Sequence, residues 1–146
     1  MNIYSKIEPD KLLHIINRKN DIAPGRVDLV PENQFIQCAA MKMQKETTFK
    51  PHKHIWKESS FMVTTDKAGD PYIEIIAQES WVVISGVVKV ILYDIDDTVL
   101  HDDILEAGDC SITLEGAHNY LIIQDAVVYE FKTGPYLGQE HDKIFI

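Results

Sequence analysis

From residue 34 onward, hydrophobic positions come in short runs that are separated by polar clusters. The runs are rich in Val, Ile, Tyr, Phe and Thr, which fit the pleated surface of a sheet. No segment between them is long and amphipathic enough to be the crossover helix of a parallel sheet. The pattern therefore predicts an antiparallel sandwich or barrel, with strands near residues 34–44, 47–54, 60–65, 71–77, 79–85, 87–94, 98–105, 109–114, 118–123 and 127–132.

The polar clusters carry residues that favour tight turns. Asp66 to Pro71, Asp94 to Asp97 and Ala107 to Asp109 each predict a turn, and Ser85-Gly86 predicts a tight hairpin corner. These positions divide the second part of the chain into strands of ordinary length.

The first 33 residues have a different character. Pro9 and Asp10 are typical helix-start residues, and the apolar residues from Leu12 to Ile16 recur roughly one turn apart. The loop signal Ala23-Pro24-Gly25 follows them. The sequence therefore predicts a single domain in two parts, an N-terminal extension with a short helix over residues 1–33 and a β-barrel over residues 34–146.

The negative net charge of the chain limits the classes of molecule that it is expected to bind. The 146 residues are about one domain in size, and they carry a formal net charge of −9. Because binding to nucleic acid or to an anionic membrane depends on clustered Lys and Arg, we expect neither partner.

Two features of the sequence concern the cellular compartment of the protein. The longest apolar run, residues 81–93, is interrupted by polar residues and is too short to cross a bilayer. The opening residues carry charges where an export signal needs an unbroken apolar core. We therefore expect a cytoplasmic protein in which Cys38 and Cys110 are reduced thiols.

Two histidines, His52 and His54, are separated by one residue within a predicted strand. Since the side chains of a strand alternate between faces, both point the same way, with Thr48 and Lys50 behind them. This arrangement suits two ligands of one metal ion. It also suits a pair of surface histidines, because so short a motif often arises by chance. The pair alone leaves both interpretations open.

Glu79 begins a hydrophobic run and shares a strand face with Trp81 and Val83. A carboxylate on an apolar face is costly unless a cation or hydrogen bonds compensate for the lost water. The neighbouring Gln78 and Ser80 project to the other face. Glu79 is therefore the candidate oxygen ligand of a metal ion.

A third segment combines Gly108-Asp109, Gly116 and His118. Together with the His52-x-His54 pair and with Glu79 followed by Gly86, it resembles the two sequence motifs of the cupin superfamily. In that family, three histidines and one glutamate hold a divalent metal inside a small jelly roll. The resemblance covers residues 34–132. It implies an all-β, single-domain cupin-like jelly roll (a double-stranded β-helix) in which the metal ligands are His52, His54, Glu79 and His118.

The sequence departs from the cupin motifs at two points. Residues 55–78 lie between His54 and Glu79, where cupins usually have only a few residues, and they predict an added pair of strands, FMVTT and YIEIIA. In the second motif, Leu114-Glu115-Gly116 replaces the usual proline-x-glycine, and His118 follows the glycine one position early. A turn of different length is needed to bring His118 to the metal.

The closing stretch VVYEFKTGPYLG, residues 127–138, resembles the ending of small WbuC-like cupins, which occur among bacterial surface-polysaccharide biosynthesis proteins. The same residues also have a purely structural interpretation. Gly134-Pro135 ends a strand, and Tyr136 packs over the barrel mouth or at a subunit contact.

The resemblance implies a metal-dependent enzyme that acts on a small molecule, of the isomerase, epimerase or dioxygenase type, with a sugar-derived substrate favoured by the tail. Three imidazoles and one carboxylate suit divalent Fe, Mn, Ni, Co or Zn. Lys50 and Tyr120 share the inward face of their strands and are the candidate catalytic acid or base. The alternative function is a non-catalytic cupin that binds a small molecule or sugar, with its metal structural or lost.

Two further expectations concern the surface. The sheet edges of a jelly roll must be covered or paired, which predicts a homodimer. His14, His101 and His141 match no part of the motifs, and we expect them on the surface.

Overall fold

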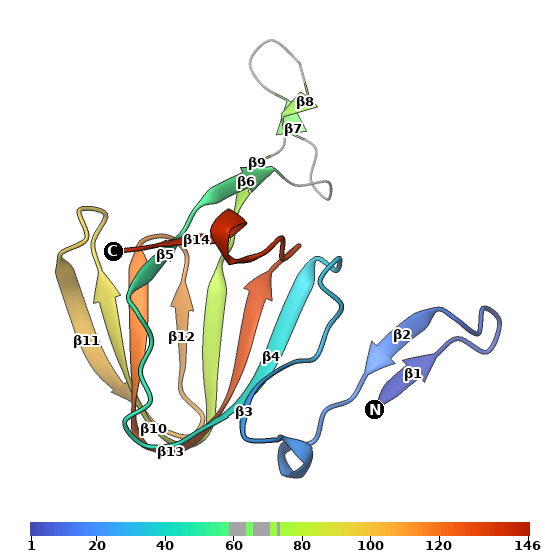
Figure 1. Ribbon diagram of the computed structural model, residues 1–146, viewed down its shortest axis with the longest axis horizontal. Coiled ribbons are helices and arrows are strands. Elements are labelled where there is room, and N and C mark those ends of the chain that lie inside the picture. The colour runs from blue at the N-terminus through green and yellow to red at the C-terminus, as the bar shows by residue number, and fades with distance from the viewer. Residues whose placement is uncertain (59–63, 66–70, 73) are drawn as a thin grey trace.

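The chain folds mainly into one antiparallel sheet of eight strands that curls around a core (Figure 1). The computed structural model describes residues 1–58, 64–65, 71–72 and 74–146. The strands follow the order β11-β10-β13-β4-β3, with β12 beside β10, and with β5 paired to both β13 and β14. The predicted all-β fold is confirmed. The bounds are β3 Gly25–Asp28, β4 Ile36–Met43, β5 His52–His54, β10 Glu79–Tyr93, β11 Val99–Leu105, β12 Cys110–Thr113, β13 Ala117–Thr133 and β14 Lys143–Phe145.

The predicted N-terminal helix is wrong. Leu12–Ile15 form β2, which pairs with β1, Asn2–Tyr4, in a hairpin that stands away from the barrel in Figure 1. So short an apolar run does not distinguish a helix from a strand, and a helix of this length is marginal on its own. Pairing with β1 satisfies the backbone instead. A single 3-10 turn, η1 Lys19–Asp21, and strand β3 follow, and β3 joins the main sheet beside β4.

β10 and β13 each run through a predicted break. β10 continues past Ser85-Gly86, so the predicted hairpin corner is wrong, and β13 joins the two strands that were expected over 118–123 and 127–132. Gly86 has a φ of +89°, and the pairing of β10 with β13 shifts register around it, as at a β-bulge. The bulge changes which residues of β10 face the core. These buried residues are Glu79, Trp81 and Val83 before it and Val88 and Val90 after it.

Between β5 and β10 the sequence predicts one added strand pair, of residues 61–65 with residues 72–77. The pairing of residues 64–65 with 71–72 agrees with it, residues 74–76 pair instead with residues 56–58, and residues 61–63 and 73 lie outside the described part of the chain. β6, Trp56–Glu58, pairs with β9, Glu74–Ile76, and β7, Thr64–Thr65, pairs with β8, Pro71–Tyr72. Apart from Pro71, the predicted turn from Asp66 lies outside the described residues. Of the strand predicted over 47–54, β5 covers only its last three residues, and Thr48 forms an isolated bridge to Leu121.

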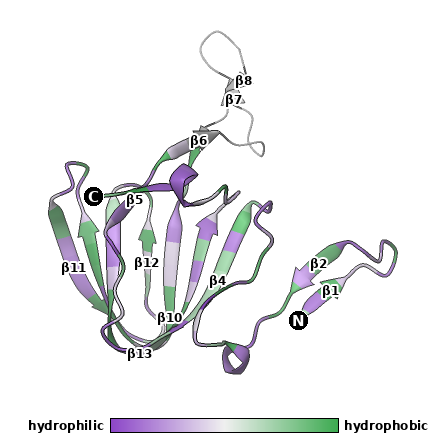
Figure 2. Ribbon diagram, viewed as in Figure 1, coloured by the Kyte–Doolittle hydropathy of each residue, from purple (hydrophilic) through white to green (hydrophobic). Residues whose placement is uncertain are grey.

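The hydrophobic core lies inside the curl of the sheet, between β4, β10 and β13. Side chains along these strands alternate between core and outer face, and the colour of the strands in Figure 2 changes along their length accordingly. Val83, Val88 and Val128 are fully buried. The core residues are Met41, Met43, Trp81, Val83, Val88, Val90, Tyr120, Ile122, Ala126 and Val128.

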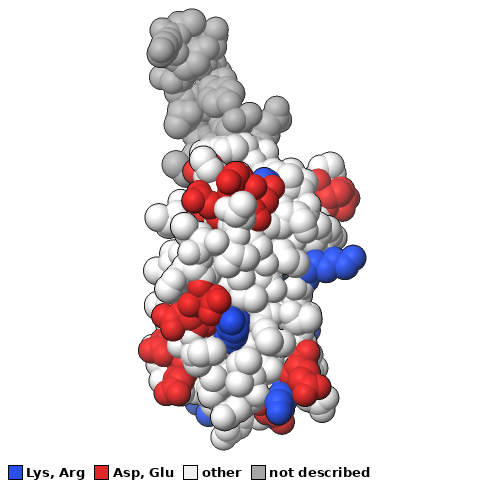
Figure 3. All heavy atoms as spheres, turned by 90° about the vertical axis from the view of Figure 1, so that its left-hand side faces the viewer, with Lys and Arg blue, Asp and Glu red and all other residues white. Residues whose placement is uncertain are grey.

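The surface has an acidic side. Asp and Glu side chains gather in several groups on the face shown in Figure 3, which lies on the side of the molecule that carries β11. Asp102 and Asp103 of β11 are at least half exposed. Such a face repels a polyanion. In the described part of the chain, no helix has the length and apolar character needed to cross a membrane.

Candidate metal centre

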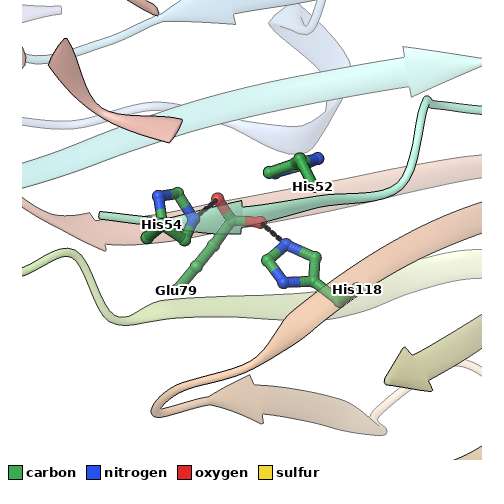
Figure 4. Close-up of side chains that lie close together, drawn as sticks. All are labelled: His52, His54, Glu79 and His118. Carbon is green, nitrogen blue, oxygen red and sulfur yellow. Dashed lines mark hydrogen bonds and ion pairs between the residues drawn. The ribbon is translucent and has the colours of Figure 1, made fainter. Parts of the chain in front are cut away.

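Four side chains from three strands meet inside the curled sheet (Figure 4). His52 and His54 lie on the inner face of β5, Glu79 begins β10, and His118 lies near the start of β13. His52 is directly opposite His118 in the pairing of β5 with β13, so both project to the same face. All four residues are at most 6% exposed, and one ligand atom from each lies within 4.8 Å of the others. The structure thus brings together the four ligands that the cupin resemblance implies.

Glu79 is the centre of the contacts within this cluster. Its Oε1 lies 3.1 Å from His118 Nε2 and accepts a 2.9 Å hydrogen bond from Trp81 Nε1, while its Oε2 lies 3.3 Å from His54 Nε2. Burial raises the pKa of Glu79, but His118 and His54 outweigh burial and hold this pKa well below its usual range. Glu79 is therefore an ionised carboxylate, the form that binds a cation.

The two histidines of β5 are oriented by contacts on the side away from the cluster. His52 Nδ1 donates a 3.0 Å hydrogen bond to the carbonyl oxygen of Lys50. His54 Nδ1 lies 3.3 Å from both the backbone oxygen and the carboxylate Oδ2 of Asp142. A hydrogen bond from Nδ1 to a carbonyl or carboxylate is the usual second contact of a metal-binding histidine. It leaves Nε2 of each ring as the ligand atom.

The cluster contains buried nitrogens that the protein itself does not satisfy. Among the described residues, His52 Nε2 has no hydrogen-bond partner, and His54 Nε2 has only its 3.3 Å ion-pair contact with Glu79; His118 Nδ1 is also unpaired, on the side of the ring away from Glu79. Buried polar atoms are nearly always paired, so such a group beside an ionised carboxylate fits a bound cation. Ligand atoms about 2.0–2.2 Å from one metal ion lie within roughly 4.4 Å of each other. The observed limit of 4.8 Å is close to that value, and the residues therefore fit a divalent metal.

His52 and His54 differ in their affinity for a proton. Burial lowers the pKa of His52 to about 4, and the nearby His118 and Lys143 act in the same direction. Burial also acts to lower the pKa of His54, but Asp142 and Glu79 outweigh it and raise this pKa to about 9. In the metal-free protein at neutral pH, His52 is neutral and His54 is protonated. Metal binding must displace the proton on His54 Nε2.

A second buried carboxylate supports the cluster from outside. Asp142 is fully buried, and its Oδ2 accepts a 2.8 Å hydrogen bond from Lys132 Nζ as well as facing His54. Lys132 lies opposite Glu79 in the pairing of β13 with β10, and its Nζ is 4.4 Å from the centroid of the Tyr136 ring. Asp142 therefore links His54 of the cluster to a buried cation on the neighbouring strand.

A cavity of about 250 Å³ adjoins the cluster, and His52 and Glu79 line it. Phe49, Trp81 and Tyr120 give it an aromatic wall, in which the rings of Trp81 and Tyr120 stack with centroids 3.8 Å apart. Pockets for drug-sized ligands occupy about 300–1,000 Å³, so this cavity suits a smaller molecule. Charged side chains complete the lining: Arg26, Asp28, Glu130, Lys132 and Lys143.

The two predicted catalytic residues have different surroundings. Tyr120 is 1% exposed and lines the cavity, with its hydroxyl 2.8 Å from Ser111 Oγ. Burial raises the pKa of Tyr120 above its usual value, so the hydroxyl keeps its proton. Lys50 is exposed and does not line this cavity, and its Nζ is 5.6 Å from the centroid of the Phe145 ring. A catalytic role for either residue stays a prediction.

Sequence reasoning missed the charged residues around the cluster. Lys143 lies opposite His54, and Phe145 opposite His52, because β14 pairs with β5. Arg26 enters the cavity lining from β3 and makes two hydrogen bonds to Glu130, of 2.9 and 2.6 Å. The only sequence signal for β14 is the short apolar run of residues 144–146, which does not reveal its partner strand.

The remaining histidines stand apart from the cluster. His14 is exposed, and the side chains of His101 and His141 are 62% and 64% exposed. Their predicted surface positions are confirmed.

Comparison with known proteins identifies the fold. No family model matches the chain, and no curated protein matches it in sequence. Solved structures do match. An RmlC-like cupin protein from Desulfovibrio desulfuricans is 13% identical with a TM-score of 0.51, and the match covers 83% of this chain and 96% of that one. The chain has the cupin fold that the sequence resemblance implied.

Two further structures with this fold are larger. An oxalate oxidase in complex with glycolate is 16% identical with a TM-score of 0.51, and the match covers 76% of this chain and 46% of that one. Oxalate decarboxylase from B. subtilis is 12% identical with a TM-score of 0.56, at 86% and 29% coverage. The chain spans less than half the length of these two proteins. At such identities the likeness concerns the fold alone.

Proposed function

We propose that this protein is a metal-dependent cupin enzyme that acts on a small molecule, with His52, His54, Glu79 and His118 as the metal ligands. The observation that carries the proposal is the cluster itself, a buried carboxylate and three histidines whose ligand atoms lie within 4.8 Å of one another, with His52 Nε2 buried and without a hydrogen-bond partner among the described residues. This ligand set suits divalent Fe, Mn, Ni, Co or Zn. The adjoining cavity of about 250 Å³ supplies room for a substrate.

A divalent metal held by four protein ligands supplies Lewis acidity, or dioxygen activation if it is redox-active, at its remaining positions. The residues of the chain have separate tasks around it. Asp142 fixes the ring of His54, and Phe49, Trp81 and Tyr120 form an aromatic wall of the cavity. Tyr120 lines the cavity with its hydroxyl protonated and 2.8 Å from Ser111 Oγ, and it is the first candidate acid or base; Lys50 is the second.

An isomerase, epimerase or dioxygenase reaction is compatible with this ligand set, and the WbuC-like tail favours a sugar-derived substrate. That an oxalate oxidase with this fold was solved with glycolate supports a small-molecule substrate. Turnover that survives replacement by a redox-inert metal identifies isomerisation, whereas oxygen consumption with Fe(II) identifies oxidation.

Elemental analysis by plasma mass spectrometry tests the metal site. We expect near-stoichiometric transition metal in the wild type and its loss in both His52→Ala and Glu79→Ala. His101→Ala is the matched control, since His101 is 62% exposed on β11 and its removal leaves the cluster intact. The absence of metal from freshly prepared and reloaded wild type contradicts the proposal.

A second measurement separates an enzyme from a binding protein with a structural metal. A catalytic site keeps an exchangeable solvent position, whereas a structural site is closed by protein ligands. Relaxation of water protons by the Mn(II)-loaded protein reports such a position directly. Fast exchange at the ion supports an enzyme, and its absence in protein that retains the metal favours the non-catalytic binding function.

A further inference from the structure

Lys143 is a cation that lines the cavity next to the metal cluster. Lys143 is half-buried on β14 and lines the cavity beside His52 and Glu79 (Figure 1 shows β14 next to β5). It lies directly opposite His54 in the pairing of the two strands, so both side chains project to the inner face. Residues opposite each other have Cβ atoms about 4.5–5.5 Å apart, which places the Lys143 side chain next to the metal cluster.

The other cations of the cavity are already paired. Arg26 bonds both Glu130, at 2.6 Å, and Asp28, at 3.0 Å, and Lys132 bonds Asp142 at 2.8 Å. Within the described part of the chain, the ammonium group of Lys143 has no hydrogen bond or ion pair to a side chain. The third acidic residue that lines the cavity, Glu79, faces His54 and His118. Among the described residues that line the cavity, Lys143 is thus the cation without a carboxylate at ion-pair distance, and Glu79, Glu130 and Asp142 act on its charge only at longer range.

We propose that Lys143 is an anion-binding residue, and that the ligand of the cavity is a small organic acid whose carboxylate lies at the Lys143 ammonium group. A second oxygen of the same ligand then faces the cluster, and its apolar part lies along Phe49 and Tyr120. The inference rests on the proposed function, because it assigns a substrate class to the same site. A charge-assisted hydrogen bond in a partly desolvated cavity favours such a ligand over a neutral one.

Calorimetry with a matched pair of ligands tests the inference on metal-loaded protein. Lactate and 1,2-propanediol differ only in that a carboxylate replaces a hydroxymethyl group. We expect the wild type to bind lactate about ten- to a hundredfold more tightly, the range that a hydrogen bond to a charged group confers. Inorganic phosphate is the third ligand, since the subsite also accepts a phosphoryl group.

Three variants assign the preference to its residue. Lys143→Met removes the charge at similar length and should abolish the preference for lactate. Lys143→Arg restores a cation and should keep it. Lys45→Met removes an exposed lysine that does not line the cavity, and should leave binding unchanged. Metal content should stay at the wild-type level in all three.

The outcomes are distinct. If the preference for lactate survives in Lys143→Met, or if neither lactate nor phosphate binds the wild type better than 1,2-propanediol at tens of millimolar, the inference is overturned. If phosphate binds more tightly than lactate and loses this advantage in Lys143→Met, the subsite stands and recognises a phosphoryl group. Failure of the proposed function looks different, since the wild type then holds no metal while calorimetry on the metal-free protein still reports the role of Lys143.

Discussion

At the scale of single residues, Asp142 decides how firmly the cluster is held. It is fully buried and it touches both His54 Nδ1, at 3.3 Å, and Lys132 Nζ, at 2.8 Å. Its charge therefore orients a ligand ring and compensates a cation whose side chain is only 9% exposed. A neutral residue at this position leaves Lys132 uncompensated and weakens the orientation of His54.

Replacing Asp142 should lower the affinity for metal. We expect Asp142→Asn to bind metal about ten- to a hundredfold more weakly, as measured by competition with a chromophoric chelator. The backbone carbonyl of residue 142 still faces His54 Nδ1, so binding should weaken without disappearing. Asp103→Asn serves as the control, because Asp103 is 68% exposed on β11. Equal affinity in wild type and Asp142→Asn would show that the carboxylate does not support the site.

The raised pKa of His54 predicts a pH-dependent stability of the metal-free protein. Because this pKa is about 9 in the fold and 6.5 otherwise, the proton on His54 stabilises the fold fully below pH 6.5, and that contribution is lost as the pH rises to 9. In chelator, the free energy of unfolding of the wild type should fall over this range by up to about 3 kcal/mol more than that of His54→Gln.

Urea unfolding at several pH values measures this difference. His101→Gln is the control, because it removes an exposed histidine and should follow the wild type. Parallel pH profiles for the wild type and His54→Gln would contradict the assignment of the proton to His54.

At the scale of elements, β10 is shaped by Gly86. The sequence predicts a chain reversal here, because Ser-Gly is a common hairpin corner, but a strand with a glycine bulge has the same local signal. A Cβ atom at Gly86 would lie 2.6 Å from the Cα of Ala126, so the glycine also allows β10 and β13 to approach. The bulge places both Glu79 and Val88 on the inner face of one continuous strand.

The steric role of Gly86 gives a stability prediction. Gly86→Ala combines a positive φ with this clash and should reduce the free energy of unfolding by about 2–4 kcal/mol. Gly108→Ala is the matched control, because Gly108 also has a positive φ, of +101°, but open space around its Cβ position. It should lose only about 1 kcal/mol in urea unfolding. Equal losses would show that backbone strain alone requires the glycine at position 86.

Local signals explain which elements the sequence predicts. β4 and β11 appear within two residues of their predicted bounds, and β11 lies between the turn signals at Asp94 to Asp97 and Ala107 to Asp109. The four cluster residues were found by matching motifs, and cross-strand pairing of His52 with His118 brings them together despite the altered turn at Gly116. By contrast, the N-terminal hairpin and the pairing of β14 with β5 depend on partners distant in sequence. No single-strand pattern reveals such a partner, so Lys143 and Asp142 escaped notice.

At the scale of the whole molecule, an apolar outer face supports the expected homodimer. Ile36, Ile112 and Phe131 are 58%, 65% and 38% exposed, and they line one shallow pocket across β4, β12 and β13. Ser80 of β10 lies opposite both Phe131 and Ile112, so these side chains form a row over neighbouring strands. Exposed apolar patches of this kind commonly mark association surfaces.

Light scattering tests this expectation. We expect a dimer at micromolar concentration for the wild type and a monomer for Ile112→Lys, because a charge on the most exposed of these three residues opposes burial of the patch. Lys89→Met changes a residue of β10 that pairs with Asp102 outside the patch, and it should remain dimeric. A wild type that is monomeric at this concentration would contradict the predicted homodimer.

The metal site should also contribute to the stability of the whole fold, because its ligands come from three strands that are distant in sequence. β5, β10 and β13 are joined at this end of the sheet by His52, His54, Glu79 and His118, so an ion bound there stabilises only the folded chain. At free metal a hundredfold above Kd, the gain is about 2.7 kcal/mol, which corresponds to a Tm higher by roughly 5–15 °C. Chelation should therefore lower the Tm of the wild type by this amount in calorimetry, and should leave His52→Ala nearly unchanged. An equal fall of the Tm in both proteins would mean that the stabilising ion is bound elsewhere. If the Tm of a wild type that had carried metal does not fall, the cluster is held in place by its hydrogen bonds to Trp81, Asp142 and Lys50 without help from the ion.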